Sequence, residues 1–239
     1  MKTKPILFNT NMVKAILNGT KTQTRRTVKF NKEIEDPKIG FSAFTGDSQF
    51  EVRGVHENGQ YGGSLFNLPF TKNHIMWVRE TVAEMYDYED HPEIYGNPKE
   101  EWKMGYWYKT DGDLKKAPYF IVNNRWKPSI FMPKEACRLF LKISRVRIER
   151  LQDISEEDAK AEGILSYNCE ITKSTWYKDY LTKEEGYGHP DHDYPSVKTA
   201  KESFKTLWIS INGEESWNEN PYVFVYDFSK TTKPENFLK

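Results

Sequence analysis

The sequence has few cysteines, no long hydrophobic run and no excess of charge of either sign. Its two cysteines, Cys137 and Cys169, lie far apart, which excludes the disulfide framework of a small secreted domain and favours a reducing compartment. No segment approaches the roughly 20 apolar residues that a membrane-spanning helix needs. The apolar run near the N-terminus is too short for a signal peptide. We therefore expect a cytoplasmic protein that does not cross a membrane.

The balance of charge excludes a further class of partner. There are 35 Lys and Arg against 35 Asp and Glu, so no global field attracts a nucleic acid or an anionic membrane, and any anion site must be local. Apolar residues make up only 37% of the chain, but 15% are aromatic, and these bury large areas. The 239 residues suffice for one large domain or two small ones. The composition predicts a modest hydrophobic core with long polar segments outside it.

Many strands and few helices are expected along the chain. Helical spacing and capping residues predict helices near 10–18, 153–163 and 196–213, and Gly19 and Gly163 can end the first two. The polar stretches at about 30–70 and 165–197 are interpreted as insertions. This order argues against a doubly wound sheet and favours an α+β fold, a small mixed or closed barrel with helices at its rim. Strands are expected at 4–8, from about 21, at 74–85, 102–110, 137–151 and 221–228, with 125–136 extended.

The stretch GTKTQTRR, residues 19–26, is the densest group of hydroxyl and cationic side chains. All charged residues from 1 to 29 are Lys or Arg, so the segment is electropositive. Arginine offers a planar fork that matches phosphates and base edges, so a binding site is one interpretation. The other is a solvated strand edge protected by charge. On residue content alone, the two interpretations are about equally well supported.

Strand geometry constrains this motif. Thr22, Thr24 and Arg26 share one face of an extended strand, and Lys21 points to the other. Lys21 and Thr24 converge only if Lys21 lies in the turn before the strand. Glu162 ends the predicted second helix, where a carboxylate opposes the helix dipole, and this hints weakly at another role.

Other candidates have simpler explanations. His189 and His192 lie three apart among aspartates and could bind a metal, but Pro190 indicates a turn, so a polar loop is favoured and no metal site is expected. Cys137 lies in a strand pattern and is expected to be packed rather than nucleophilic. Several aromatic residues could stack on bases, although most should be core: Trp77, Trp102, Tyr106, Trp107, Tyr108 and Trp126.

GTKTQTRR resembles the G-x-K-T-x-T-x-R signature of the ASCH family, a branch of the PUA-like β-barrels. The resemblance extends to KPILFNTNMVKAILNGTKTQTRR, MWVRET, KPSIFMP, VRIERLQDISEEDAKAEGI and LWISINGEESWNENPYVFVYDF, as in ASCH proteins of phages and prophages. It implies that residues 1–239 form a single PUA-like domain, with the two insertions outside the compact family core. The implied partner is a nucleoside or a nucleic acid.

Small bacterial members of this family hydrolyse the amide of N(4)-acetylcytidine, and the resemblance carries their functional residues to this chain. Lys21, Thr24 and Glu162 are then catalytic: Lys21 is the base, Thr24 attacks the carbonyl, and Glu162 orients the lysine or shuttles the proton. The implied mechanism needs no cofactor or metal. The candidates for binding substrate are Thr22, Arg25, Arg26 and Arg79.

Departures from the family pattern leave other functions open. Many members carry a Gly-Asp turn where this chain has Asn73 and His74. The alternatives are a non-catalytic module that reads a base in RNA or DNA, a ribonuclease, and a phage structural protein. Zero net charge favours a small ligand over a long nucleic-acid track. The sequence indicates no oligomeric state beyond monomer or dimer.

Overall fold

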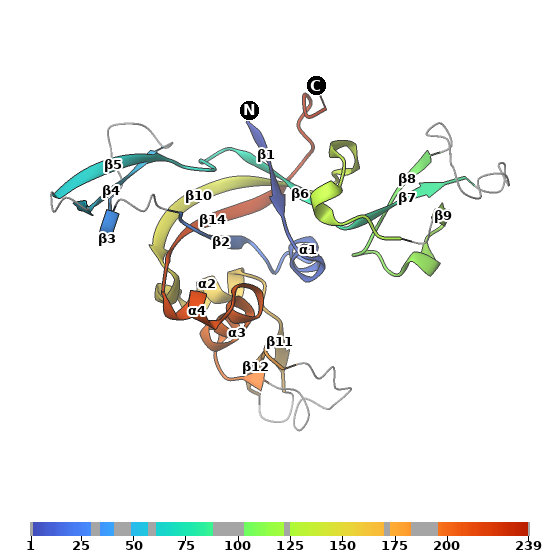
Figure 1. The fold of residues 1–239 in the computed structure, drawn as a ribbon. Helices are drawn as coiled ribbons and strands as arrows, with labels where there is room; N and C mark the ends of the chain where they lie inside the picture. Colours follow the sequence, from blue (N-terminus) through green and yellow to red (C-terminus); the bar gives the residue numbers. More distant parts are fainter. Residues whose placement is uncertain are drawn as a thin grey trace. The chain divides into compact units, whose positions relative to one another are not determined.

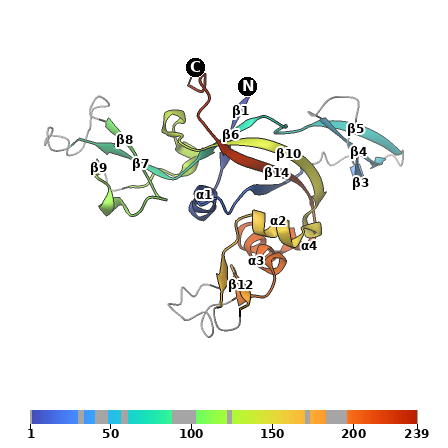
Figure 2. The same ribbon diagram turned by 180° about the vertical axis from the view of Figure 1, so that it is seen from behind.

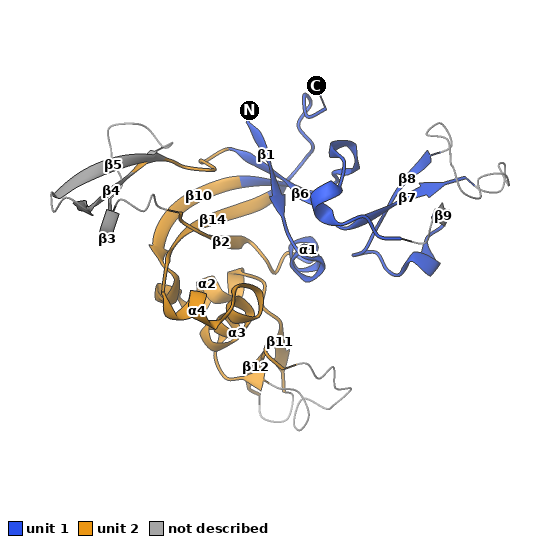
Figure 3. Ribbon diagram, viewed as in Figure 1, with its two compact units in different colours: residues 1–18, 74–142, 230–239 blue, residues 19–73, 143–229 orange. Residues whose placement is uncertain are grey.

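The computed structural model describes residues 2–29, 34–40, 49–56, 61–87, 103–121, 125–169, 173–182 and 196–238. It is a mixed α+β structure with several sheets and, in these residues, four α-helices. Its contacts form two compact units, each assembled from segments distant in sequence (Figure 3). The first contains residues 1–18, 74–142 and 230–239, and the second contains 19–73 and 143–229.

The first unit is built on a small mixed sheet. Strand β1 (Thr3–Leu7) pairs in parallel with β6 (Ile75–Arg79), and β6 pairs antiparallel with the start of β10 (Phe140–Arg150). Helix α1 (Thr10–Leu17) follows β1 directly (Figure 1). Its N-cap is Asn9, whose side chain accepts a hydrogen bond from the Met12 amide at 2.9 Å.

A second sheet in this unit has β7 (Val82–Tyr86) at its centre, between β8 (Lys103–Tyr108) and β9 (Phe120–Ile121). Three short 3₁₀ turns follow β8: η4 (Leu114–Lys116), η6 (Ser129–Phe131) and η7 (Lys134–Ala136). One apolar cluster of the unit consists of Ile75, Val82, Met132, Ala136, Cys137, Phe140 and Phe237.

The second unit is built on an antiparallel sheet in which β14 (Tyr222–Thr231) lies between β10 and β2 (Gln23–Thr27). Both views show β10 and β14 curving side by side (Figure 2). In the β14–β2 ladder Tyr226 is opposite Thr24, and Val225 is opposite Arg25. Apolar residues occupy both faces of β14, as is typical of a central strand.

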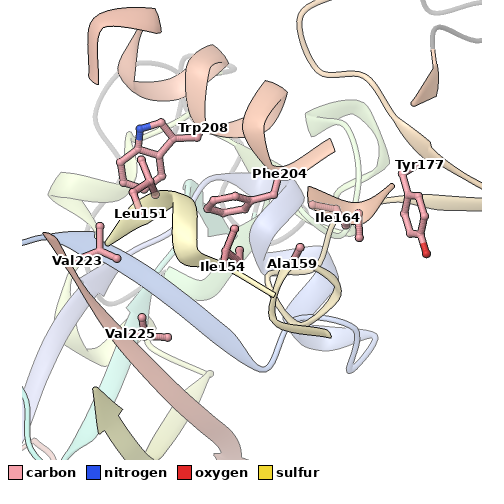
Figure 4. Close-up of a cluster of buried hydrophobic side chains, with 10 residues drawn as sticks. Leu151, Ile154, Ala159, Ile164, Tyr177, Phe204, Trp208, Val223 and Val225 are labelled. Atoms are coloured by element: carbon pink, nitrogen blue, oxygen red, sulfur yellow. The ribbon is translucent and has the colours of Figure 1, made fainter. Parts of the chain in front are cut away.

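Three helices pack on one face of this sheet. They are α2 (Glu156–Ala161), α3 (Ala200–Asn212) and α4 (Glu214–Asn218), with the 3₁₀ turn η8 (Leu151–Asp153) before α2. Trp208 of α3 lies over Leu151 and Phe204 over Ile154, with Val223 and Val225 of β14 beneath (Figure 4). Alternate residues of β14 therefore face the helices. The cluster is Leu151, Ile154, Ala159, Ile164, Tyr177, Ala200, Phe204, Trp208, Val223 and Val225.

Each expected insertion contains a small sheet. In the first, strands β3 (Ile34–Gly40), β4 (Gln49–His56) and β5 (Tyr61–Asn67) form an antiparallel sheet. Strands β11 (Ser166–Asn168), β12 (Thr175–Lys178) and β13 (Ser196–Val197) form the other.

The α+β class is confirmed, while no closed barrel is found in the described part of the chain. The single-domain assignment stays a prediction. Two expected elements are wrong in detail: 74–85 is two strands rather than one, and 125–136 contains two 3₁₀ turns rather than being extended throughout. No helix in the described residues is long and apolar enough to cross a bilayer.

Candidate functional site

A buried ion pair joins the opening motif to the second helix. Lys21 Nζ lies 2.6 Å from Glu162 Oε2 and donates a second hydrogen bond, of 2.8 Å, to the Glu162 main-chain oxygen. The side chain of Lys21 is 0% exposed and that of Glu162 5% exposed. The structure therefore brings together two of the three predicted catalytic residues, which are 141 positions apart in sequence.

Backbone pairing fixes this contact. Lys21 lies before β2 in an isolated antiparallel bridge with Glu162, and the Thr22 amide donates to the Ala161 oxygen at 2.9 Å. These bonds satisfy carbonyls that the end of α2 leaves free. Ser155 begins this helix by accepting from the Asp158 amide, and Gly163, at φ 78°, ends it. Lys21 thus occupies the pre-strand position that its convergence with Thr24 requires.

Burial lowers the pKa of Lys21 from its ordinary 10.5. Desolvation is the largest cause, since it disfavours the ammonium form. The carboxylate of Glu162 acts in the opposite direction, and Arg26 and Arg25 add smaller lowering effects. The site therefore holds a lysine that releases its proton more readily than an exposed one.

Arg25, which the sequence analysis assigns to substrate binding, is buried among protein groups. The residue is 4% exposed, and its guanidinium faces protein groups on the helix side of the sheet, 5.5 Å above the Phe204 ring. Its two terminal nitrogens donate to these groups, and through one of them Arg25 holds the Glu162 carboxylate. Its hydrogen-bond partners are Glu162 (3.0 Å), Glu149 (2.6 Å), Asp158 (3.3 Å) and Gln23 (2.6 Å).

Sequence reasoning missed the polar network behind Arg25. Arg147 binds Glu149 at 3.0 Å and Asp227 at 3.1 Å, and also contacts Asp158. Burial alone would raise the pKa of Asp158, but the hydrogen bonds from Gln23 and Arg147 outweigh it, and the pKa is lowered. The available signal was the i, i+2 spacing of Arg147 and Glu149, which places both side chains on one face of β10.

Thr24 and Arg26 lie on the other face of β2. Thr24 is 2% exposed and stands opposite Tyr226 in the ladder. Arg26 lies near enough to Lys21 and Glu162 to influence the pKa of Lys21, and burial lowers its own pKa. Phe70 packs edge-on against Tyr226, with ring centroids 5.3 Å apart. The first insertion thus supplies an aromatic side chain to the Thr24 face.

The remaining candidates lie elsewhere. Thr22 is exposed beside the Lys21 bridge. Arg79 belongs to the first unit, where it bonds to the main-chain oxygens of Ile130 and Met132. The described residues contain no group of three metal-ligating side chains, and His189 and His192 lie outside them. Cys137 and Cys169 are buried free thiols, and burial raises the pKa of Cys137 to about 11.

This arrangement provides a proton-transfer pair beside a hydroxyl-bearing strand. The lysine can exchange a proton with the carboxylate that it contacts, and Arg26 adds positive charge on the Thr24 face. Comparison of the chain with protein-family models, with curated proteins and with solved structures found no match. The ASCH resemblance therefore stays a prediction carried by the sequence motifs.

Proposed function

We propose that this protein recognises a nucleobase and hydrolyses the amide of an N(4)-acylated cytosine nucleoside. The carrying observation is the buried Lys21–Glu162 pair, with a lysine whose pKa is lowered. The G-x-K-T-x-T-x-R resemblance supplies the substrate class, and with it we propose a single ASCH domain of PUA-like fold. Two buried free thiols suit the reducing cytoplasm proposed as its location.

In the proposed reaction neutral Lys21 takes the proton of the Thr24 hydroxyl, and the oxygen attacks the acyl carbon. The carbon–nitrogen bond then breaks, and the amine leaves as cytidine with a proton delivered through Lys21 and Glu162. Water hydrolyses the acyl-threonine and releases the carboxylic acid. Arg26 and Thr22 hold the pyrimidine or its sugar, and Arg25 keeps the Glu162 carboxylate oriented through the 3.0 Å bond.

The burial of Thr24 favours a second candidate, recognition of a base without hydrolysis. At 2% exposure its hydroxyl is closed to solvent, and a substrate carbonyl reaches it only if neighbouring side chains move. A binding module needs no such access, since Arg26 and Thr22 are more exposed than Thr24. In this candidate the same residues near β2 bind a base, but no amide bond is hydrolysed.

The test is release of cytidine from N(4)-acetylcytidine by the purified full chain, followed by chromatography. We expect release by the wild type and a loss of at least about 100-fold in Lys21→Met and Glu162→Gln, since each removes one partner of the proton-transfer pair. The matched control is Lys103→Met, which breaks a Lys–Glu pair of 3.3 Å in the first unit. Its activity should equal that of the wild type.

Three results decide between the candidates. No release by the wild type at high enzyme over hours contradicts the hydrolase and leaves the binding module. An equal loss in all three variants contradicts the assigned site, because it shows a general loss of folding. Retained activity in Lys21→Met also contradicts the mechanism.

A further inference from the structure

Tyr226 has a polar atom that no part of the proposed mechanism uses. It lies directly opposite Thr24 in the β14–β2 ladder, so the two side chains leave the same face of the sheet. Its ring is stacked with Phe224, at 6.0 Å between centroids, and meets the edge of Phe70. The packing fixes the ring beside the proposed nucleophile.

The Tyr226 hydroxyl is buried without an acceptor. The residue is 1% exposed, and no group among the described residues accepts a hydrogen bond from its hydroxyl. Burial raises its pKa, so the phenol keeps its proton at neutral pH. Two polar groups influence it, the Arg26 guanidinium and the Phe70 amide, and both are donors that cannot accept a proton.

A buried donor without an acceptor is costly, and such groups in folded proteins call for a specific explanation. Here the donor stands beside a second donor, Arg26, on the face that carries Thr24. A carbonyl oxygen has two lone pairs and can accept from both groups. The missing partner on this face is therefore an oxygen acceptor.

We propose that Tyr226 is a specificity-determining residue, whose hydroxyl donates a hydrogen bond to a carbonyl oxygen of the bound acylcytosine, alongside Arg26. The inference rests on the proposed function, since it takes its ligand from that reaction. A base or nucleoside without a carbonyl at this place leaves the phenol unpaired and binds more weakly.

Tyr226→Phe in the full chain tests this role with two readouts. In the protein without ligand, the substitution removes the cost of a buried hydroxyl that has no acceptor, so the melting temperature should rise by about 2–4 °C. The bond to the ligand is lost, so KM for N(4)-acetylcytidine should rise about tenfold, with kcat within about twofold. If Tyr226 had only a structural role, its replacement would not raise both the melting temperature and KM.

Tyr180→Phe is the matched control in the same unit. The Tyr180 hydroxyl accepts a hydrogen bond of 3.0 Å from the Leu165 amide, so its loss leaves a donor unpaired. The melting temperature should therefore fall, and KM should stay at the wild-type value. The two substitutions remove the same atom and have opposite effects on stability.

The outcomes separate this inference from the function on which it rests. A wild type that does not act on N(4)-acetylcytidine contradicts the proposed function and the Tyr226 role together. An active wild type with unchanged KM in Tyr226→Phe contradicts the Tyr226 role alone. A lower melting temperature with unchanged KM does the same, and indicates that water inside the protein satisfies the hydroxyl.

Discussion

Lys21 is subject to two opposing influences. Removal from water disfavours its ammonium group, while the carboxylate of Glu162 stabilises it at 2.6 Å. A buried pair of this kind contributes little net stability, but removing one partner leaves an uncompensated charge. When Lys21 is removed, Glu162 Oε1 keeps its hydrogen bond to Arg25, and only Oε2 loses its partner Lys21.

We expect Lys21→Met to lower the free energy of unfolding by about 3 kcal/mol at pH 7, measured in urea. The difference from wild type should grow towards pH 10. Because the folded-state pKa lies below 10.5, the unfolded chain binds more protons in that window, and wild-type stability rises with pH. The control is Lys160→Met, which removes an exposed lysine from α2. A penalty that is equal at both pH values would contradict the lowered pKa.

Individual side chains were only partly predictable from the sequence. The Lys21–Glu162 contact was reached through the family resemblance and could not come from strand alternation, because Lys21 lies outside β2. Strand alternation places Thr24 and Arg26 on one face of β2 and Arg25 on the other, but it does not indicate which face the helices cover. The structure shows that they cover the Arg25 face, so the charge of Arg25 is used inside the protein.

At the scale of elements, α2 and α3 depend on each other. The Glu156 carboxylate of α2 accepts from the Ala200 amide at 2.9 Å and the Lys201 amide at 3.2 Å, at the first turn of α3. A helix start has unpaired amides and a partial positive charge, so a carboxylate stabilises it. This contact also places α3 against the helix that ends in Glu162.

Glu156→Gln should therefore lower the free energy of unfolding by about 1 kcal/mol, because the amide keeps the shape and loses the charge. The neighbouring Glu157→Gln is the control, since Glu157 is exposed and its replacement should stay within about 0.5 kcal/mol of wild type. Urea midpoints of the three proteins measure this. Equal midpoints would show that the carboxylate charge contributes nothing to α3.

Elements with a clear period were predictable, and those determined by single residues were not. β10 runs unbroken through Ser144 and Arg145, where its apolar residues change from odd to even positions, and both residues are exposed. The stretch at 74–85 is interpreted from sequence as one strand, but Glu80 and Thr81, which follow Arg79 as a polar run, separate β6 from β7. Pro128 and Pro133 each start a 3₁₀ turn in a stretch that proline content made look extended.

At the scale of the whole molecule, charge balance bears on the choice of ligand. The 35 cationic side chains equal the 35 acidic ones, and in the second unit Arg25 and Arg147 are bound to carboxylates. Few cations of that network remain for phosphates. The division into two units escaped prediction, because each unit interleaves distant segments of one chain.

We expect the affinity for cytidine to change by less than about twofold between 50 and 200 mM salt, measured by titration calorimetry. A nucleoside carries no phosphate, so few counterions are released on binding. A twelve-residue oligocytidine is the comparison. If it binds more tightly than cytidine and loses about 1,000-fold over the same range, several phosphates are engaged and a nucleic acid is the ligand.

The pairing of β2 with β14 also determines how late in synthesis the site can form. About 200 residues separate the two strands, and at roughly 5–20 residues per second the ribosome needs about 10–40 s to make them. Lys21 leaves the ribosome before Glu162 has been synthesised. During that time β2 has no β14 with which to pair. The site is therefore one of the last parts of the protein to form, and a chain interrupted before Tyr222 makes every charged residue of the motif and assembles none of its pairing with β14.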